Sequence, residues 1–523
     1  MLTSNSFEMM KTTNAFSITI VLLITSFIGA CSSDLEQYPL DPDSFTEVQV
    51  YSDVNEAKKA LAKVYGSLVT GGQDIGNGDI AGIDSNFSQF SRMLLNLNEV
   101  PTDNVVVGWG DPGLPDLNTI SWSSENSFTQ AMYYRLGQMV SFANSFIKNA
   151  DPLSDNIEVQ AFIAEARFIR AYAYYNLMDL YANIPLVTEV SDVLPSQSGR
   201  PEIFSFIETE LKELEGLLKT TNEYGRVDVV AAQALLTRLY LNAEVYTGTA
   251  RYSDVVTYAD KVLNSGVYSL HDNYEELFMA DNDENGAQLE NIFVLPFDGI
   301  NTITYGGTTF ITHGFTGGDM NAADRGINNG WGGYRSTSAL VDKFGGQNPT
   351  SWNDDRALFF TNGQQYNQTD LANFKHGYGI TKVTNKRSDG QPARDTSGEH
   401  ADTDLPLIRV GEIHLNRAEA NFRIGNIAAA LAEINTLRAR SNAPALGALT
   451  LETILDERAR ELYMEGVRRT DLIRFGKFVS SEYVWPFKGG AASGTGVNAI
   501  YEIYPLPSQV LLVNPNLQQN PGY

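Results

Sequence analysis

The sequence contains few cysteines, few basic residues and few histidines. Its single cysteine in 523 residues can form neither an intrachain disulfide nor a thiolate metal site. Lys and Arg number 37 against 63 Asp and Glu, and the resulting net charge of −26 repels a phosphate backbone. The five histidines lack metal-ligand spacing, and no phosphate-binding loop or nucleophile elbow is present. We therefore exclude nucleic acid as a partner and expect no metal and no cofactor.

The single cysteine, Cys31, ends an export signal. Lys11 is followed by an apolar run over residues 16–28, and small residues stand just before Cys31. A transmembrane helix is the alternative, but the run is short for a span of about 20 residues. The small residues before the cysteine resemble a bacterial lipobox, after which the cysteine is lipidated. We predict a lipoprotein signal peptide over residues 1–30 and a lipid anchor on Cys31.

Helices with an apolar stripe recur along the chain. The stretch 405–478 contains a helix whose apolar residues follow a 3-4-3 spacing, and the small residue Ala418 precedes that helix by nine positions. The residues of this stripe are Ile427, Ala430, Ile434 and Leu437. The same spacing, with Ala243 nine positions ahead, recurs in Tyr252, Val255, Ala259 and Val262. Two copies of this pattern predict a mainly α fold of tetratricopeptide-type helical hairpins, which bury their faces by stacking.

Two long regions lack this helical periodicity. Residues 71–126 and 269–404 are rich in Gly, Asn and Asp and carry scattered aromatic residues, and the second region also has short β-like runs. We predict a helical scaffold over approximately residues 50–70, 127–268 and 405–480, with the two irregular regions as large loop-rich insertions. Because binding residues are concentrated on loops held by a rigid scaffold, we expect ligand binding in these two regions.

Several segments, taken in order, resemble the SusD/RagB family. They are the lipobox with its acidic tether, EARFIRAYAYYNLMDLYANIPLV, LPLIRVGEIHLNRAEANFRIGN, ERARELYMEGVRRTDLIRFGKF and the ending YPLPSQVLLVNPNLQQNPGY. The resemblance implies a single domain over residues 31–523 and an outer-membrane, cell-surface lipoprotein of Bacteroidetes. It also implies a non-enzymatic protein that binds glycans, or in some members peptides, and acts as the lid of a TonB-dependent transporter of the SusC type.

Two charged motifs invite a functional interpretation that their spacing does not support. Glu457, Glu461 and Glu465 recur every four residues among arginines, whereas a glycosidase needs two carboxyl groups facing each other across a cleft. We interpret this ladder as structural. The run 281–286 matches the first half of an EF-hand loop, but Ile292 stands where a bidentate Glu is expected. We interpret the run as a solvated turn.

Aromatic residues on the loops are the best candidates for a glycan site, because sugar C–H faces stack on aromatic rings. Trp109 in NVVVGWGDPG and Trp331 in NNGWGGYRS are flanked by glycines that leave the rings little to pack against, and Tyr334 and Arg335 follow Trp331. For each Trp, packing in the core is the alternative. Further candidates, chosen for their place in the two loop regions, are Tyr305, Tyr378, Asp84, Asn86 and Asp319.

The resulting hypothesis is a surface lipoprotein that captures an oligo- or polysaccharide and delivers it to a partner SusC-like transporter. The segment around Trp331 is similar to that of family members that handle neutral β-glucans or fructans, and the negative charge disfavours a sulfated ligand. One alternative is a peptide- or protein-binding receptor on the same scaffold. A surface glycosidase is a further alternative, for which we expect no activity.

Overall fold

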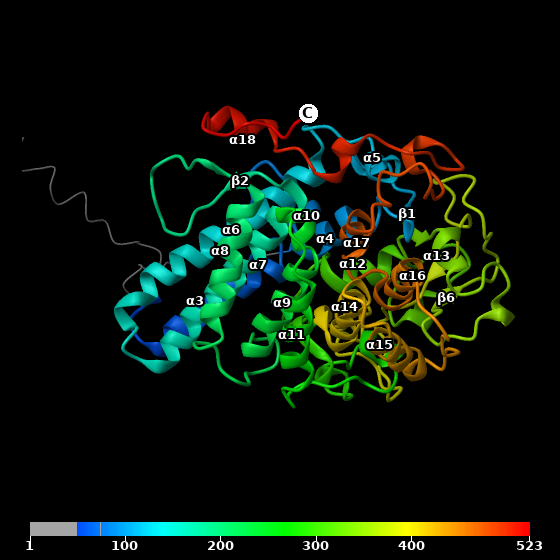
Figure 1. Ribbon diagram of the computed structural model, residues 1–523, viewed down its shortest axis with the longest axis horizontal. Helices are drawn as coiled ribbons and strands as arrows, with labels where there is room; N and C mark the ends of the chain where they lie inside the picture. Colours follow the sequence, from blue (N-terminus) through cyan, green and yellow to red (C-terminus); the bar gives the residue numbers. More distant parts are fainter. Residues whose placement is uncertain (1–49, 74) are drawn as a thin grey trace, which may run out of the picture. The chain divides into compact units, whose positions relative to one another are not determined.

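The computed structural model describes residues 50–73 and 75–523, whose helices and strands are labelled in Figure 1. The chain divides into two units after Ala57, and the fold below is that of the second unit, residues 58–523. Helix α3 (Val54–Val69) spans this boundary. The predicted signal peptide and Cys31 lie outside the described residues. Among the helices in the described ranges, none is both long enough and apolar enough for a membrane span.

The first half of the scaffold is a series of neighbouring helices. Its members are α6 (Ser127–Ala150), α7 (Ile157–Tyr181), α8 (Arg200–Leu214), α9 (Val229–Leu241), α10 (Ala243–Thr247) and α11 (Tyr252–Leu263). Along this series α6 packs on α7, α7 on α8, α8 on α9 and α9 on α11. The helices begin where the sequence supplies a cap: the side chains of Asn126, Asn156 and Asp228 accept hydrogen bonds from first-turn N–H groups.

The two predicted hairpins stack on one another. Helices α14 (Val410–Arg423) and α15 (Ile427–Arg440) form one hairpin, α9 and α11 form the other, and α11 packs against α14 (Figure 1). Ala418 and three of the four stripe residues of α15 are fully buried in one core cluster, whereas Ile427 is 42% exposed. The prediction of stacked helical hairpins is confirmed, although Ala243 begins a short separate helix.

The C-terminal part of the scaffold starts with a strand. Strand β8 (Leu405–Arg409) pairs antiparallel with β4 (Asn291–Leu295), so the stretch 405–478 does not begin as a helix. The remaining helices are α16 (Leu451–Leu462), α17 (Arg468–Arg474) and α18 (Ser508–Val513). Thr450 and Thr453 form a capping box at the start of α16, which fixes where that helix begins.

The first region predicted as loop contains two helices, α4 (Phe90–Asn98) and α5 (Leu114–Thr119). Every residue of α4 is buried, its polar residues included. Phe90, Met93, Leu94 and Leu97 follow the spacing of an apolar helical face, but the helix has only nine residues, fewer than the roughly 11–18 over which such a period is read. This region also holds β1 (Val105–Val107), which pairs with β5 (Tyr334–Ser336). The prediction of residues 71–126 as wholly irregular was therefore wrong at these two helices.

The second loop region is irregular with short elements, as predicted. Besides β4 and β5 it contains α12 (Gly307–Gly314), α13 (Ser338–Asp342), β6 (Phe359–Phe360) and β7 (Gly379–Ile380). Two short pairs complete the strands of the described ranges, β6 with β7, and β2 (Ile184–Pro185) with β3 (Gln197–Ser198). Short 3₁₀ turns occur throughout the described part of the chain, at Ser85–Phe87, Asp151–Leu153, Glu275–Phe278, Ala287–Leu289, Ala322–Arg325, Pro349–Ser351, Lys488–Gly490 and Ala499–Glu502.

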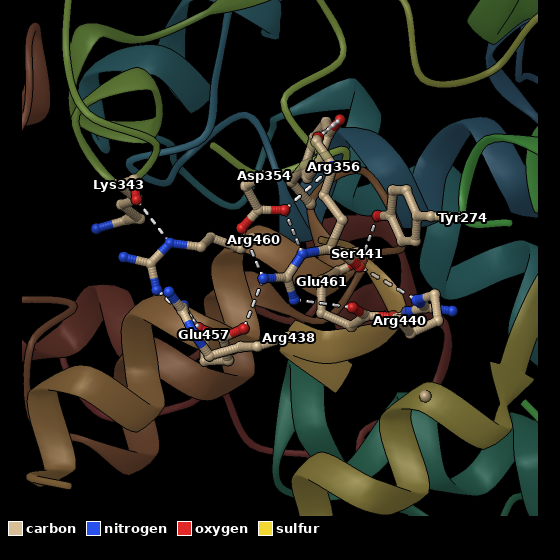
Figure 2. A network of polar contacts seen from close by, with 12 residues as sticks. Tyr274, Lys343, Asp354, Arg356, Arg438, Arg440, Ser441, Glu457, Arg460 and Glu461 are labelled. Atoms are coloured by element: carbon tan, nitrogen blue, oxygen red, sulfur yellow. Dashed lines mark hydrogen bonds and ion pairs between the residues drawn. The ribbon is translucent and has the colours of Figure 1, made fainter. Parts of the chain in front are cut away.

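A buried network of ions joins the loops to helix α16. Figure 2 shows Arg356, from the second loop region, between Glu457 and Glu461, with N–O distances of 2.6 and 3.0 Å. Arg409 of β8 pairs with Glu461 at 2.6 Å and with Glu465 at 2.8 Å. The interpretation of the glutamate ladder as a structural feature that pairs with arginines is confirmed.

The arginines keep these buried glutamates charged. Burial alone raises the pKa of Glu461, but the charges of Arg440, Arg409 and Arg356 outweigh it and hold that pKa well below its usual value. All three arginines donate to Glu461, whose side chain has no exposed surface. The network therefore anchors the scaffold and offers a ligand no carboxylate.

Candidate functional site

Pairing of β1 with β5 brings together two tryptophans that are 222 positions apart in the chain. Val107 at the end of β1 faces Tyr334 at the start of β5, and Gly108 N–H donates to Gly333 O at 2.9 Å. Trp109 and Trp331 thus lie just beyond the same end of the strand pair. The Nε1–H of Trp109 donates to Trp331 O at 3.3 Å.

Trp109 is half-buried and rests on a floor of aromatic rings. Phe310 and Tyr334 meet it edge-on, at centroid distances of 6.0 and 5.2 Å. A Cβ at Gly333 would lie only 2.4 Å from the indole, so glycine is required for the ring to lie against this backbone. Gly333, which follows Trp331 by two positions, therefore lets the ring of Trp109 approach the main chain.

Trp331 and Tyr305 form the other side of the same site. Both side chains are half-buried, and their rings are 6.3 Å apart and tilted by 57°. The imidazole of His313 stacks on Trp331 at 4.7 Å. The Tyr305 hydroxyl donates to Glu399 at 2.6 Å, and this hydrogen bond together with partial burial raises the pKa of Tyr305. Tyr305 is thus held by the hydrogen bond of its hydroxyl, and Trp331 is held by the stack on one face of its indole.

These three rings line an open groove of about 810 Å³. The residues that line it are Phe87, Arg92, Gly108, Trp109, Gly110, Asp111, Pro112, Tyr305 and Trp331. The lining combines aromatic faces with one cationic and one anionic side chain, so the groove as a whole is close to neutral. Aromatic platforms beside a few polar groups are suited to a ligand that has both apolar C–H faces and hydroxyls.

Arg92 of α4 supplies the cationic group of the groove. Its guanidinium lies over the rings of Phe310, Phe87 and Trp109 at 4.4, 4.9 and 5.9 Å. Burial lowers the pKa of Arg92, against the opposing influence of Tyr334, Asp111 and Asp84. Even so lowered, an arginine stays charged near neutral pH. Its N–H groups are therefore fixed donors, held in place by aromatic packing.

Tyr334 and Arg335 support the groove from beneath. Tyr334 is fully buried and donates from its hydroxyl to Asn96 at 2.7 Å. Arg335 is also fully buried, and its guanidinium donates to the carbonyls of Leu371 at 2.6 Å and His376 at 3.0 Å. Burial lowers the pKa of Arg335 to about 10. Side chains without exposed surface do not reach a ligand in this conformation, so these two hold the loops in place.

The remaining predicted residues are divided between the groove and other parts of the loops. Asp84 is exposed, and its charge acts on Arg92, which places it near the groove. Asn86 lies in the adjacent 3₁₀ turn, and its side chain is outside the described part of the structure. Tyr378 is 5% exposed and donates to Gln347 O, while Asp319 pairs with Lys375 at 2.7 Å. Neither Tyr378 nor Asp319 lines the groove.

The described residues contain no cluster of three or more Asp, Glu, His or Cys that could hold a metal ion. In the turn over residues 281–286, Asp281 accepts hydrogen bonds from Ser388. Asp283 pairs with Arg394, and Glu284 pairs with Arg387. The carboxylates of this turn are thus engaged by neighbouring groups of the protein.

Reasoning from sequence found the three groove rings but missed Arg92, together with Phe87 and Asp111. Arg92 lies in QFSRMLLNLN, where a single cation interrupts an apolar run. Such a cation signals either a buried ion pair or a function. That signal was hidden because the segment was not recognised as a helix.

Comparisons with known proteins agree with this architecture. Residues 352–523 match the family model described as SusD family, and residues 56–241 match the model described as "Starch-binding associating with outer membrane". The "Starch-binding protein SusD" of Bacteroides thetaiotaomicron is 36% identical over 97% of this chain and 98% of its own length. A SusD-like protein of Bacteroides ovatus is 26% identical over 75% of this chain and 73% of its own.

Solved structures share the fold at lower identity. A "Laminarin binding SusD-like protein" has a TM-score of 0.69 at 22% identity, covering 90% of this chain and 100% of its own. The "Surface glycan-binding protein A from Bacteroides fluxus" has a TM-score of 0.67 at 21% identity, covering 90% of this chain and 100% of its own. At such identities the similarity establishes the fold.

Proposed function

We propose that the chain, which belongs to the SusD family, binds a starch-type α-glucan in the groove lined by Trp109, Trp331 and Tyr305. Members of this family are non-catalytic carbohydrate-binding proteins associated with the outer membrane. The observation that carries the proposal is the convergence of these three rings, drawn from distant loops, on one open groove. The rings supply stacking platforms, and Arg92 and Asp111 supply a donor and an acceptor for sugar hydroxyls.

The tilt between the rings favours a curved ligand. Tyr305 and Trp331 are inclined by 57°, so two successive sugars that stack on them must turn relative to each other. An α-1,4-linked glucan turns in this way along its length, whereas a β-1,4-linked glucan is a flat ribbon. Starch is selected among curved glucans because the relative at 36% identity is named a starch-binding protein. This proposal replaces the sequence-based expectation of a β-glucan or fructan.

The charges around the groove support a neutral ligand. The lining carries Arg92 and Asp111, and the carboxylates of Asp84 and Glu399 lie close by. A uronate-rich or sulfated chain would be repelled by these carboxylates and by the net charge of −26. A neutral polysaccharide meets no such barrier.

The binding step serves uptake at the cell surface. Lipidation of Cys31 would tether the protein to the outer membrane, and the bound glucan would pass to a TonB-dependent SusC-like transporter that the protein covers as a lid. The resemblance of residues 16–31 to a signal peptide with a lipobox supports the anchor. Replacing Cys31 with Ala should move the protein from the membrane fraction to the soluble fraction, and retention in the membrane fraction would contradict the anchor.

A glycan panel tests the ligand. Isothermal titration calorimetry with maltoheptaose, a laminarin oligosaccharide, an inulin oligosaccharide and a peptide mixture should show heat of binding with maltoheptaose. Binding to the laminarin or inulin oligosaccharide alone would keep the groove but change the sugar. Binding to peptides alone would favour the peptide-receptor alternative.

A further inference from the structure

His313 lies directly beneath Trp331. It belongs to α12, its side chain is 1% exposed, and its imidazole stacks on the indole at 4.7 Å with 27° between the planes. The main chains are also joined, because Trp331 N–H donates to His313 O at 2.8 Å. The ring that faces the groove is therefore fixed to His313 both through the backbone and through the buried face of its side chain.

The surroundings of His313 disfavour a charge on the imidazole. Within the described residues neither ring nitrogen completes a hydrogen bond, although Asn329 and the main chain of Glu399 lie nearby. Burial lowers the pKa of His313, His400 adds to this effect, and the nearby polar groups only partly oppose it. The imidazole is thus neutral near neutral pH.

The titratable groups around His313 come from two neighbouring segments. Helix α12 and residues 327–333 carry no other titratable side chain. The loop at 399–400 contributes Glu399, which accepts the Tyr305 hydroxyl, and His400, whose ring lies 5.1 Å from that of Tyr305. Each ring on this side of the groove thus has a histidine against it, but only His313 stacks face to face with a tryptophan.

We propose that His313 is a positioning residue for glycan binding: its neutral imidazole holds the indole of Trp331 against the groove, and protonation of the imidazole weakens binding. This inference rests on the proposed function. A buried imidazolium needs water or an anion, and turning toward Glu399 would break its stack with Trp331. If the stack persists, the cation draws the indole's electron density away from the face that meets the sugar.

The stability of the fold is expected to depend on pH in the same direction as glycan binding. Because the pKa of His313 is lower in the folded protein than in the unfolded chain, the unfolded chain takes up the proton first as the pH falls. The free energy of unfolding is therefore highest above the unfolded pKa of about 6.5 and decreases below it. The groove and the fold around it are therefore both expected to weaken in mild acid.

The first experiment measures maltoheptaose affinity by calorimetry at about pH 7.5 and about pH 5.5. Wild type should lose affinity at the lower pH, by less than the roughly tenfold that an unshifted pKa of about 6.5 would allow, because burial lowers the pKa of His313. His313→Phe keeps a flat uncharged ring and should bind like wild type at the higher pH and lose little at the lower. His313→Ala should bind weakly at both. An acid loss that persists in His313→Phe would overturn the proposal.

Two control variants separate His313 from other histidines. His414→Gln alters a histidine of α14 that bonds Glu433 at 2.6 Å, and it should keep the wild-type pH profile. His400→Phe removes the other imidazole next to the groove rings and should keep most of the acid loss. Disappearance of the acid loss in His400→Phe, with its persistence in His313→Phe, would assign the effect to His400 and contradict the proposal.

A second readout needs no ligand. Protonated imidazole quenches a stacked indole, so tryptophan fluorescence of wild type minus that of Trp331→Phe should decrease in acid. The midpoint should lie below the usual histidine pKa of about 6.5, because burial lowers the pKa of His313. His313→Phe should abolish this titration, and a titration unchanged in that variant would overturn the proposal. If wild type binds no maltoheptaose at either pH, the proposed function fails, while the fluorescence titration still decides whether His313 acts on Trp331.

Discussion

The ion network on α16 and the aromatic groove use their most conspicuous side chains in opposite ways. Glu461 is surrounded by Arg356, Arg409 and Arg440 and has no exposed surface. Trp331 rests one face on His313 and lines an open groove. In the network every strong interaction is already made within the protein, whereas the groove leaves interactions for a ligand. Buried charge pairs therefore mark the scaffold here, and incompletely covered aromatic rings mark the candidate site.

The largest effect is expected from breaking the network. Glu461→Gln leaves three buried arginines without one anion, and should cost about 3–5 kcal/mol in the free energy of unfolding. Urea unfolding followed by circular dichroism measures the loss. Glu452→Gln is the matched control, because Glu452 lies on the same helix, is 78% exposed and pairs only loosely with Lys477, at 3.3 Å. It should change stability by less than about 0.5 kcal/mol. Equal losses in the free energy of unfolding for both variants would contradict a stabilising role of the network.

A glutamate with a different environment sharpens the comparison within the scaffold. Glu99 is fully buried and accepts from Asn104 and Gly466 N–H, and burial raises its pKa from 4.5 to about 7. Because the folded state holds this proton more tightly, stability falls as the pH rises from 4.5 to 7. Between these pH limits, the free energy of unfolding of Glu99→Gln should rise by up to roughly 3 kcal/mol relative to that of wild type. Urea unfolding at several pH values checks this, and a difference independent of pH would contradict it.

Removal of a groove ring should affect binding more than folding. Trp331→Ala removes one stacking platform and should cost on the order of 1–3 kcal/mol of maltoheptaose affinity, by analogy with base stacking on aromatic residues. Calorimetry measures the change. Trp352→Ala is the control, because Trp352 packs on Phe359 and Tyr378 and does not line the groove. It should lower stability and leave affinity unchanged, and the reverse outcome would place the site elsewhere.

The smallest effect is expected at Arg92. Arg92→Lys keeps the charge but loses the planar fork that lies among Phe87, Trp109 and Phe310. We expect a loss of about 1 kcal/mol in maltoheptaose affinity, the net contribution of a typical hydrogen bond. Arg387→Lys, at an exposed ion pair with Asp389, should leave affinity unchanged. An Arg92→Lys variant with wild-type affinity would limit Arg92 to packing.

The sequence was sufficient to predict the helical hairpins because their apolar stripes depend on local spacing. It failed at α4, whose apolar stripe spans only nine residues and whose polar residues are buried as well. The flanking glycines led us to select Trp109 and Trp331, and both line the groove. The same argument could not separate Tyr305, which lines the groove, from Tyr334, which is buried beneath it, because burial is decided by the β1–β5 pairing of distant segments.

Hydrogen–deuterium exchange with and without maltoheptaose tests most directly whether the loops bind and the scaffold supports. The groove segments at residues 84–93, 105–112 and 303–335 should exchange more slowly when maltoheptaose is present. Peptides from α16 and α17 should exchange at the same rate in both conditions. Protection confined to α16 and α17, with no change around Trp109 and Trp331, would contradict the division between a charged scaffold and an aromatic site.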